Sequence, residues 1–403
     1  MNSARMKPAT ITRVVLLLAL VSLFTDISSE MLYPVMPLYL QSIGFSAVWI
    51  GLLEGVAQVV IGFATGYFGK LSDQLGTRMP FVRTGYLLSA VAKPMMILWN
   101  SHVWVLFARI SDRLGKGIRT SARDAVLIDE SDAENRGKVF GFHRGMDTLG
   151  AAIGPLLALI YLYYHPDDYS FLFVIAFVPA VIGSGLTFFI RENKRVTVVK
   201  SNKTGFLSFL SYWKIAGTEY KRIVIGLCFF ALINSADSFL FMIAHANGIR
   251  DTNLILAYVF YNLIFAATAY PSGILADKIG MRNIFVLGLI FFVIAYFGFS
   301  NVQSSPVLFV LFGIYGLYGA FTDGVSKAWI SLHCHAQDRG KALGFYKSVT
   351  SILAMVSSLL VGVFWESISP SFSILYSAIG GVIVIIYFLL FLPGRVKHSP
   401  TNK

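Results

Sequence analysis

The chain has 403 residues, of which 56% are apolar and 13% charged, and its formal net charge is +12. So few charged side chains cannot cover a water-soluble surface at this length, which excludes an ordinary soluble protein and favours a membrane protein. The basic residues lie between apolar segments, which excludes a basic nucleic-acid-binding domain and is typical of topology signals. Cys228 and Cys334 are the only cysteines, so no disulfide framework is expected.

Twelve segments are long and apolar enough to span a bilayer, which takes about 20 mostly apolar residues each. The first continues past Asp26 and Glu30 and has no small-residue cleavage site, so we interpret it as a retained span rather than a signal peptide. The expected spans are 13–38, 47–69, 80–99, 103–127, 138–164, 169–190, 222–245, 253–276, 283–300, 306–330, 341–366 and 371–392.

The loops differ in charge, and this difference predicts the topology. If the N-terminus lies inside, the outer loops lack Lys and Arg except for Arg250, whereas the inner loops are basic. Both termini are therefore expected in the cytoplasm. We predict a bundle over 1–190, an interfacial cytoplasmic linker over 191–221 and a second bundle over 222–403.

Two sequence patterns occur twice. A pattern of Gly, Asp, Gly and Arg after the second span recurs 204 residues later, and Arg136-Gly137-Lys138 recurs 203 residues later as Arg339-Gly340-Lys341. Two repeats at nearly the same offset predict two related halves of six spans each. The first pattern comprises Gly69, Asp73, Gly76 and Arg78 and, in its second copy, Gly273, Asp277, Gly280 and Arg282.

Both copies of this pattern resemble the signature loop of the major facilitator superfamily, and the resemblance extends over essentially the whole chain. It implies an all-α membrane fold with twelve transmembrane helices in two pseudo-symmetric six-helix bundles. Helices 1, 4, 7 and 10 would line a central cavity between the bundles. The eight loop residues would form a gate that closes the inner side.

The fourth span carries an unusual charged stripe. At about 100° per residue, Arg109, Asp112, Lys116, Arg119 and Arg123 fall within roughly an 80° arc of one helix face. Such a stripe cannot face lipid, so it must line a water-filled path or meet acidic partners. We predict that Asp112, Lys116 and Arg119 contact substrate.

The same span contains two further predictions. Arg123 and Asp124 lie near its inner end and are expected to form ion pairs of the gate. Arg113 is followed four residues later by Gly117, which is similar to the superfamily's fourth-span pattern. The resemblance implies a role for Arg113 in proton coupling.

The fifth span contains Gly141, Gly150, Gly154 and Pro155, a spacing similar to the superfamily's antiporter signature. Small residues four apart allow close helix packing, and the proline adds a bend. This pattern favours exchange transport. Asp147 can reach a basic neighbour, His143 or Arg144, one turn away.

Two hypotheses are open for Asp26 and Glu30, which lie one turn apart in the first span. They can carry the coupled proton, because two neighbouring carboxylates are not easily ionised together. They can instead form structural ion pairs with the cations of the fourth or fifth span.

In the second half, Asn234 and Asp237 in the seventh span and Lys327 in the tenth are further substrate-binding candidates. Lys327 also lies one turn from Asp323, so an ion pair between these two side chains is the alternative prediction.

The function predicted from these features is secondary active transport across a bacterial inner membrane by alternating access. The intramembrane carboxylates favour coupling to protons. The cation-rich stripe favours a small anionic or zwitterionic solute, such as a carboxylate or a carboxylate siderophore. A drug/proton antiporter for lipophilic compounds is the alternative, and a membrane-embedded enzyme or a transporter-like sensor is more remote. Import or export and the substrate itself are left open.

No metal-ligand spacing, P-loop or nucleophile elbow is present, so we expect no cofactor, no metal and no enzymatic activity. The expected partners are the small-molecule substrate, protons and the lipid bilayer. We expect a monomer that binds no nucleic acid.

Overall fold

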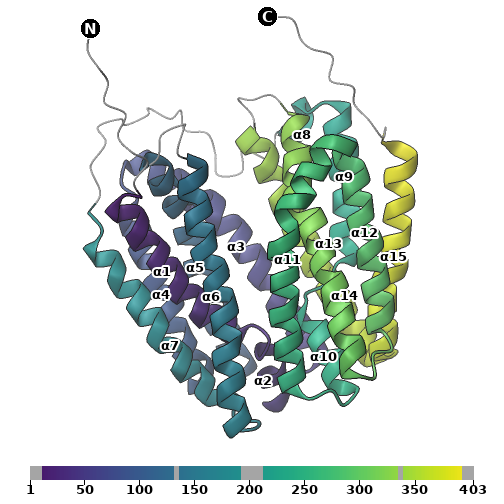
Figure 1. The fold of residues 1–403 in the computed structure, drawn as a ribbon, viewed down its shortest axis with the longest axis horizontal. Helices are drawn as coiled ribbons and strands as arrows, with labels where there is room; N and C mark the ends of the chain where they lie inside the picture. The colour runs from purple at the N-terminus through teal and green to yellow at the C-terminus, as the bar shows by residue number, and fades with distance from the viewer. Residues whose placement is uncertain (1–10, 131–135, 192–211, 335–338, 393–403) are drawn as a thin grey trace, which may run out of the picture. The chain divides into compact units, whose positions relative to one another are not determined.

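The computed structural model describes residues 11–130, 136–191, 212–334 and 339–392, and the regular elements in these ranges are all helical (Figure 1). The first part of the chain forms α1 (Arg13–Leu32), α2 (Met36–Ser42), α3 (Ala47–Leu75), α4 (Met79–Leu98), α5 (His102–Asp129), α6 (Arg136–Tyr164), α7 (Tyr169–Leu186) and the 3-10 turn η1 (Thr187–Phe189). The second part forms α8 (Tyr212–Ile215), α9 (Thr218–Ile233), α10 (Ser238–Ala246), α11 (Asp251–Ile279), α12 (Met281–Phe299), α13 (Ser305–Leu332), α14 (Arg339–Ser367) and α15 (Pro370–Phe391).

Each of the twelve predicted spans coincides with one helix or with two consecutive helices, which confirms the all-α membrane fold. Two of these spans are built from two helices each, with a break between α1 and α2 and another between α9 and α10. Pro34 and Pro37 lack the N–H group that a continuous helix would need at the first break. At the second break, polar residues from Asn234 to Asp237 replace the apolar run, and the N–H of Ala236 donates to Ser358 Oγ at 3.2 Å.

Ten segments of the described chain are long and apolar enough to cross a membrane. The spans predicted at 80–99 and 103–127, which form α4 and α5, are not among these ten. α5 carries charged residues along much of its length and packs against α4. A charged helix is tolerated within a bilayer when protein rather than lipid covers its polar side chains.

One compact unit, unit 1, comprises Met1–Tyr33, Phe63–Ala158 and Ser170–Asn202. Within the described ranges it contains α1, part of α3, α4, α5, most of α6 and nearly all of α7. Apolar side chains of α1, α4 and α5 supply most of one buried cluster, which consists of Val15, Leu18, Val21, Met79, Val82, Tyr86, Ala122, Val126, Leu127, Val139 and Ile190.

Glycines set the contact between α1 and α6 in unit 1. A Cβ added at Gly150 would lie 2.7 Å from the carbonyl oxygen of Leu23, and one added at Gly154 would lie 2.7 Å from the backbone nitrogen of Met31. The two backbones therefore approach too closely for any larger residue. Pro155 lies inside α6, and Gly141 is among the α6 residues whose surroundings are not described.

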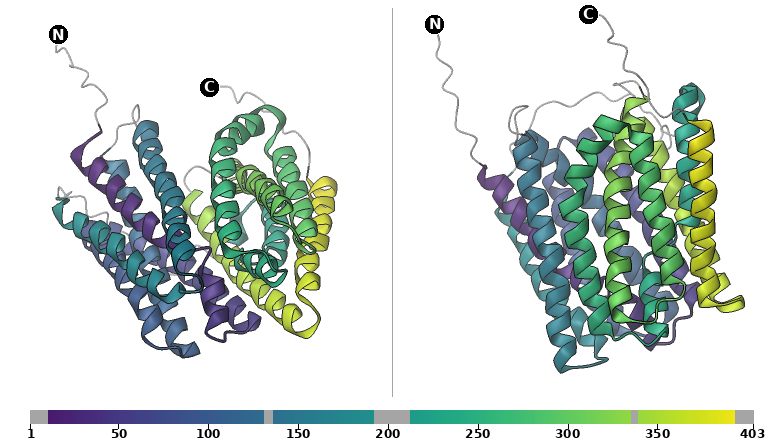
Figure 2. Two further views of the ribbon diagram at one scale, coloured as in Figure 1. Left: turned by 60° about the horizontal axis from the view of Figure 1, so that its bottom comes forward. Right: turned by 45° about the vertical axis from the view of Figure 1, so that its right-hand side comes forward.

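The other compact unit, unit 2, comprises Pro34–Gly62, Leu159–Tyr169 and Lys203–Lys403. Helices α11, α12 and α13 pack together and appear in green in Figure 2. The start of α3 packs closely on α14, because a Cβ added at Gly55 would lie 2.8 Å from Met355 Cα and one added at Gly362 would lie 2.7 Å from the Ala47 carbonyl. The predicted bundle limits of 1–190 and 222–403, with the linker 191–221, stay a prediction.

Candidate functional site

The charged face of α5 is held against α4 by a pair of glycines in unit 1. A Cβ added at Gly115 would lie 2.6 Å from the Gly85 carbonyl oxygen and 2.6 Å from Ser89 Oγ. A Cβ added at Gly85 would lie 2.6 Å from the Gly115 carbonyl. Both positions therefore need glycine, and their contact brings α4 side chains within reach of the cations of α5.

Arg119 is fixed by two groups of α4. Its Nη1 donates to Ser89 Oγ at 2.8 Å, and its guanidinium carbon lies 4.4 Å from the ring centroid of Tyr86. The hydroxyl and the aromatic face hold the guanidinium in one orientation, and Arg119 is 5% exposed.

Ser89 joins several groups of this site. Its hydroxyl donates to the carbonyl of Asp112 at 3.0 Å, and its own carbonyl accepts from Lys93 Nζ at 3.5 Å. Ser89 and Tyr86 were not predicted from the sequence. A signal was available, because Gly85, Ser89 and Lys93 are four residues apart and therefore share one face of α4.

The predicted stripe on α5 is divided between buried and exposed positions. Arg109 and Arg119 are buried, whereas Lys116 is exposed. Asp112 lies between these extremes and pairs with its neighbour, with Arg113 Nε 3.4 Å from Asp112 Oδ2. A shared helix face therefore does not give these side chains a shared environment.

Asp26 interacts electrostatically with two cations of α5, Lys116 and Arg119. The charged groups that act electrostatically on its carboxylate are Glu30, Asp147, Lys116 and Arg119. The structure thus brings predicted proton-coupling residues of α1 and α6 together with predicted substrate-binding residues of α5. All of them belong to unit 1.

Asp147 is shared by two basic neighbours of α6. Its Oδ2 lies 3.5 Å from His143 Nδ1 and 3.9 Å from Arg144 Nη1. His143 and Asp147 are largely buried, whereas Arg144 is exposed. The expected contact with a basic neighbour one turn away is present for both residues.

The predicted gate residues differ between the two sequence repeats. Gly76 and Gly280 both have positive φ, at 63° and 100°, so each turn uses a backbone conformation that glycine adopts readily. The side chains of Asp73 and Asp277 lie outside the described residues. A Cβ added at Gly69 would lie 2.8 Å from Ser121 Cβ, whereas nothing lies within 4 Å of one added at Gly273.

The two arginines of the repeat also have different contacts. Arg78 forms an ion pair with Asp129 at the end of α5, whereas Arg282 Nη2 donates to the Leu389 carbonyl at 3.5 Å. Near Asp129, Arg123 Nη2 lies 2.9 Å from Asp124 Oδ1, and Arg123 Nη1 donates to Ser22 Oγ at 3.2 Å. Arg123 therefore links α5 to α1.

In unit 2, the break between α9 and α10 faces a cluster of tyrosines. Asn234 Nδ2 donates to the hydroxyl of Tyr318 at 3.0 Å, and the hydroxyl of Tyr315 donates to Asp237 Oδ1 at 2.5 Å. Tyr315 also stacks on Tyr261 with ring centroids 5.4 Å apart. The tyrosines were not predicted as part of a site.

Lys327 contacts Asp323 in the way that the spacing predicts. Its Nζ lies 2.8 Å from Asp323 Oδ1, one helical turn away, and both side chains are more than half exposed. The ion pair is therefore the alternative that the geometry matches.

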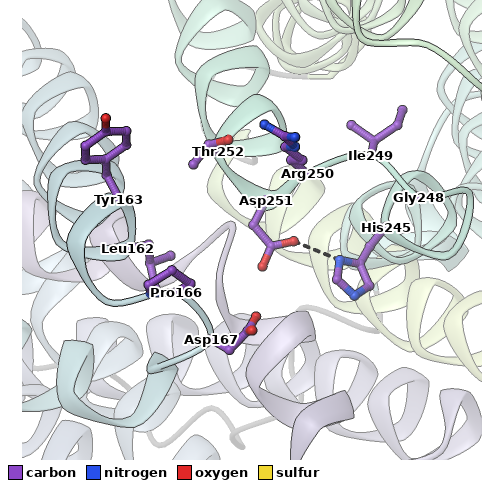
Figure 3. A pocket seen from close by; sticks show the side chains of 10 residues that line it. All are labelled: Leu162, Tyr163, Pro166, Asp167, His245, Gly248, Ile249, Arg250, Asp251 and Thr252. Atoms are coloured by element: carbon purple, nitrogen blue, oxygen red, sulfur yellow. Dashed lines mark hydrogen bonds and ion pairs between the residues drawn. The ribbon is translucent and has the colours of Figure 1, made fainter.

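A pocket of about 480 Å³ lies in unit 2, where the end of α6 and the following loop meet the end of α10 and the start of α11 (Figure 3). His245 Nδ1 lies 2.7 Å from Asp251 Oδ1, and the hydroxyl of Tyr169 contacts Asp251 as well. The loop between α6 and α7 is thereby tied to α10 and α11. The lining residues are Leu162, Tyr163, Pro166, Asp167, His245, Gly248, Ile249, Arg250, Asp251 and Thr252.

Comparison with known proteins gives the family. The model of the Major Facilitator Superfamily matches residues 18–247 and 223–403. The chain belongs to this superfamily. The expected family and fold are therefore confirmed, and the chain is a multi-pass membrane transporter of small molecules.

Two relatives and one solved structure illustrate the range of similarity. An uncharacterized MFS-type transporter of Methanocaldococcus jannaschii is 32% identical over 386 residues, which cover 94% of each chain. Citrate exporter 1 of Aspergillus niger is 26% identical over 152 residues, which cover 38% of this chain and 29% of the exporter. A mutant of the nucleoside transporter NupG has the same fold, with a TM-score of 0.79, 13% identity, and coverage of 94% of this chain and 100% of the other.

Proposed function

We propose that this chain is a proton-coupled secondary transporter of the bacterial inner membrane that moves a small anionic or zwitterionic organic solute by alternating access. A carboxylate, including a carboxylate siderophore, is the substrate class that fits best. Both termini lie in the cytoplasm in this proposal, and the protein acts as a monomer without enzymatic activity.

The cation-rich face of α5 is the observation that carries this proposal. Arg109, Arg113, Lys116 and Arg119 lie on one helix with Asp112 as the only acid among them. Cations inside a membrane protein are costly and are retained mainly where they serve a function. An anionic group bound there would offset their charge. The similarity of part of the chain to a citrate exporter supports the same substrate class.

Asp26 supports the proton-coupling part of the proposal. Its carboxylate interacts with Lys116 and Arg119 and also with the carboxylates of Glu30 and Asp147. Taking up or releasing a proton at such a group changes the charge that the cations of α5 face. Proton and substrate binding would therefore be coupled through shared electrostatics, which biases the populations of the two access states.

The direct test is uptake of labelled citrate and succinate into proteoliposomes that contain the purified protein. Lys116→Ala and Arg119→Ala should each reduce the rate at least tenfold, because each removes a cation from the binding face. Lys214→Ala is the matched control, since Lys214 is an exposed lysine of the short helix α8. If both α5 variants transport at the rate of the control, the assignment of the site to α5 is wrong.

A drug/proton antiporter for lipophilic compounds is the second candidate function. The tyrosine cluster around Asp237 favours it, because stacked aromatic rings bind flat apolar or cationic molecules well. Lipophilic cations and organic anions can be compared as drivers of proton flux in the same proteoliposomes. A flux driven by the cations alone would favour this second function over the first.

A further inference from the structure

Two buried cations of unit 1 contact the same serine, Ser89, where α4 packs against α5. Lys93 Nζ lies 3.5 Å from the Ser89 carbonyl oxygen, and Arg119 Nη1 lies 2.8 Å from the Ser89 hydroxyl. Lys93 and Arg119 are each 5% exposed. The two positive groups therefore approach the same residue from different helices, out of contact with most of the solvent.

No ion pair between described residues includes Lys93 or Arg119. Asp112 acts electrostatically on both Lys93 and Arg119, and it is already paired with Arg113 at 3.4 Å. Asp112 thus faces four cations, Lys93, Arg109, Arg113 and Arg119. Asp26 acts on Arg119 as well, but it is not among the groups that act on Lys93. A buried charge without a close partner costs several kcal/mol, so this arrangement needs further negative charge.

Lys116 is a separate cationic position on the same helix. It is exposed, and it lies three residues before Arg119, which places the two side chains on neighbouring parts of one face. Arg119 therefore connects the exposed lysine with the buried Lys93. The three residues form a line of positive charge from an exposed to a buried position.

We propose that Lys93 and Arg119 form an anion subsite, positioned by Ser89, and that the transported solute carries two anionic groups, one for this subsite and one for Lys116. This inference rests on the proposed function and makes its substrate class narrower. A guanidinium and an ammonium group together suit a carboxylate, because the guanidinium can donate two parallel hydrogen bonds to it.

Ser89 acts on this subsite as a positioning residue. Its hydroxyl accepts a hydrogen bond from Arg119 and donates one to the Asp112 carbonyl, so both of its bonds are directional. The contact between Gly85 and Gly115 gives it no room to move, since a Cβ added at Gly115 would lie 2.6 Å from Ser89 Oγ. The guanidinium is therefore preorganised before a ligand binds.

Thermal unfolding of the purified full chain with succinate and butyrate tests this proposal. The two probes have the same number of carbon atoms and differ in the second carboxylate. Ionic strength is matched with chloride at pH 7. A ligand that binds only the folded state raises Tm, and at equal concentration the tighter ligand raises it more, in step with the logarithm of one plus the ratio of ligand concentration to Kd. Succinate should raise Tm at least twice as much as butyrate does.

Variants then assign the difference to the subsite. Lys93→Met should reduce the succinate shift to the butyrate shift and leave the butyrate shift unchanged, because Lys116 still binds one carboxylate. Lys93→Arg keeps the charge and should restore at least half of the difference. Ser89→Ala should weaken succinate binding and leave butyrate binding unchanged. Lys214→Met, at an exposed position of α8, should behave as the wild type.

The results separate failure of this inference from failure of the proposed function. If succinate and butyrate raise Tm equally, or if Lys93→Met keeps the succinate preference, the second subsite is wrong and anion transport stands. If neither probe raises Tm above the chloride control and the α5 variants transport normally, both proposals fail together.

Discussion

At the residue scale, the position of Asp26 makes a direct prediction about coupling. Asp26→Asn removes a carboxylate that faces Lys116 and Arg119 but keeps the shape of the side chain. We expect the variant to bind and exchange substrate while an imposed pH gradient no longer drives accumulation. Substrate exchange and pH-driven accumulation should be measured in the same proteoliposomes, with Asp168→Asn as a control at an exposed position. Accumulation at the wild-type level would transfer the role to Glu30 or Asp147.

The residues of the candidate site were partly predictable from sequence. Asp26, Lys116 and Arg119 stand out because ionisable residues are rare in apolar spans, and the structure brings them together. Helical periodicity did not separate exposed Lys116 from buried Arg119, because burial depends on which helix covers each position. Tyr86 and Ser89 were missed for the same reason, since tyrosine and serine are ordinary residues until the neighbouring helix is known.

At the element scale, the contact between α4 and α5 predicts an unequal response to the same substitution at two glycines. Gly115→Ala should lower the free energy of unfolding by about 1–3 kcal/mol, because the new methyl group overlaps backbone atoms of α4 and overpacking costs that much. Gly145→Ala in α6 is the matched control, since nothing lies within 4 Å of its added Cβ. Alanine should stabilise that helix by up to about 1 kcal/mol.

Thermal and chemical unfolding of both variants in one detergent would measure the difference between these glycines. Transport should fall with stability in Gly115→Ala, because the displaced element carries Arg119. Equal stability of the two variants would contradict the close contact of α4 and α5.

The loop between α6 and α7 makes a second prediction at this scale. Tyr169→Phe removes a hydroxyl that contacts the carboxylates of Asp251 and Asp167, so it should cost about 1.5–3 kcal/mol, the usual net value of a hydrogen bond to a charged group. Amide hydrogen exchange of residues 165–170 should become faster, because this loop loses a link to α11. Tyr163→Phe is the control, since Tyr163 is exposed and lines the same pocket. Unchanged exchange in Tyr169→Phe would show that the loop is held by other contacts.

Helices were the part of the fold that the sequence predicted best. Each apolar segment of about 20 residues became a helix, because a backbone in lipid must satisfy its own hydrogen bonds. The breaks near Pro34 and between Asn234 and Asp237 were missed, since a count of apolar residues runs across short polar interruptions. Polar residues such as Asn234 can bond locally with the backbone and end a helix even within an apolar span.

At the scale of the whole molecule, the repeat in the sequence reflects a shared local fold with different partners. Gly76 and Gly280 both have positive φ, so a glycine ends the preceding helix in each copy, although Arg78 precedes α4 whereas Arg282 lies in the first turn of α12. Arg78 and Arg282 nevertheless contact different groups, an aspartate side chain and a backbone carbonyl. The residue that corresponds to Asp129 at the offset of 203 is Leu332, which cannot form an ion pair. Sequence symmetry therefore predicted the turns and not the ionic contacts.

This asymmetry predicts that the two arginines respond differently to removal. Arg78→Ala removes the ion pair with Asp129, and for a partly exposed pair this should cost about 1 kcal/mol of stability. Arg282→Ala removes only a long hydrogen bond to a carbonyl and should cost less. If the Arg78 contact also latches the inner gate, as the resemblance of this loop implies, Arg78→Ala should change the transport rate more than it changes stability. The double variant Arg78→Asp/Asp129→Arg exchanges the two charges. It should recover part of the transport rate lost in Arg78→Ala, because the two positions attract each other again. Transport rates and Tm of the single and double variants measure this coupling. If Arg78→Ala and Arg282→Ala have equal effects and the exchanged pair recovers no transport, the Arg78 contact is not a gate latch. Both arginines would then act only as basic residues that set the membrane topology.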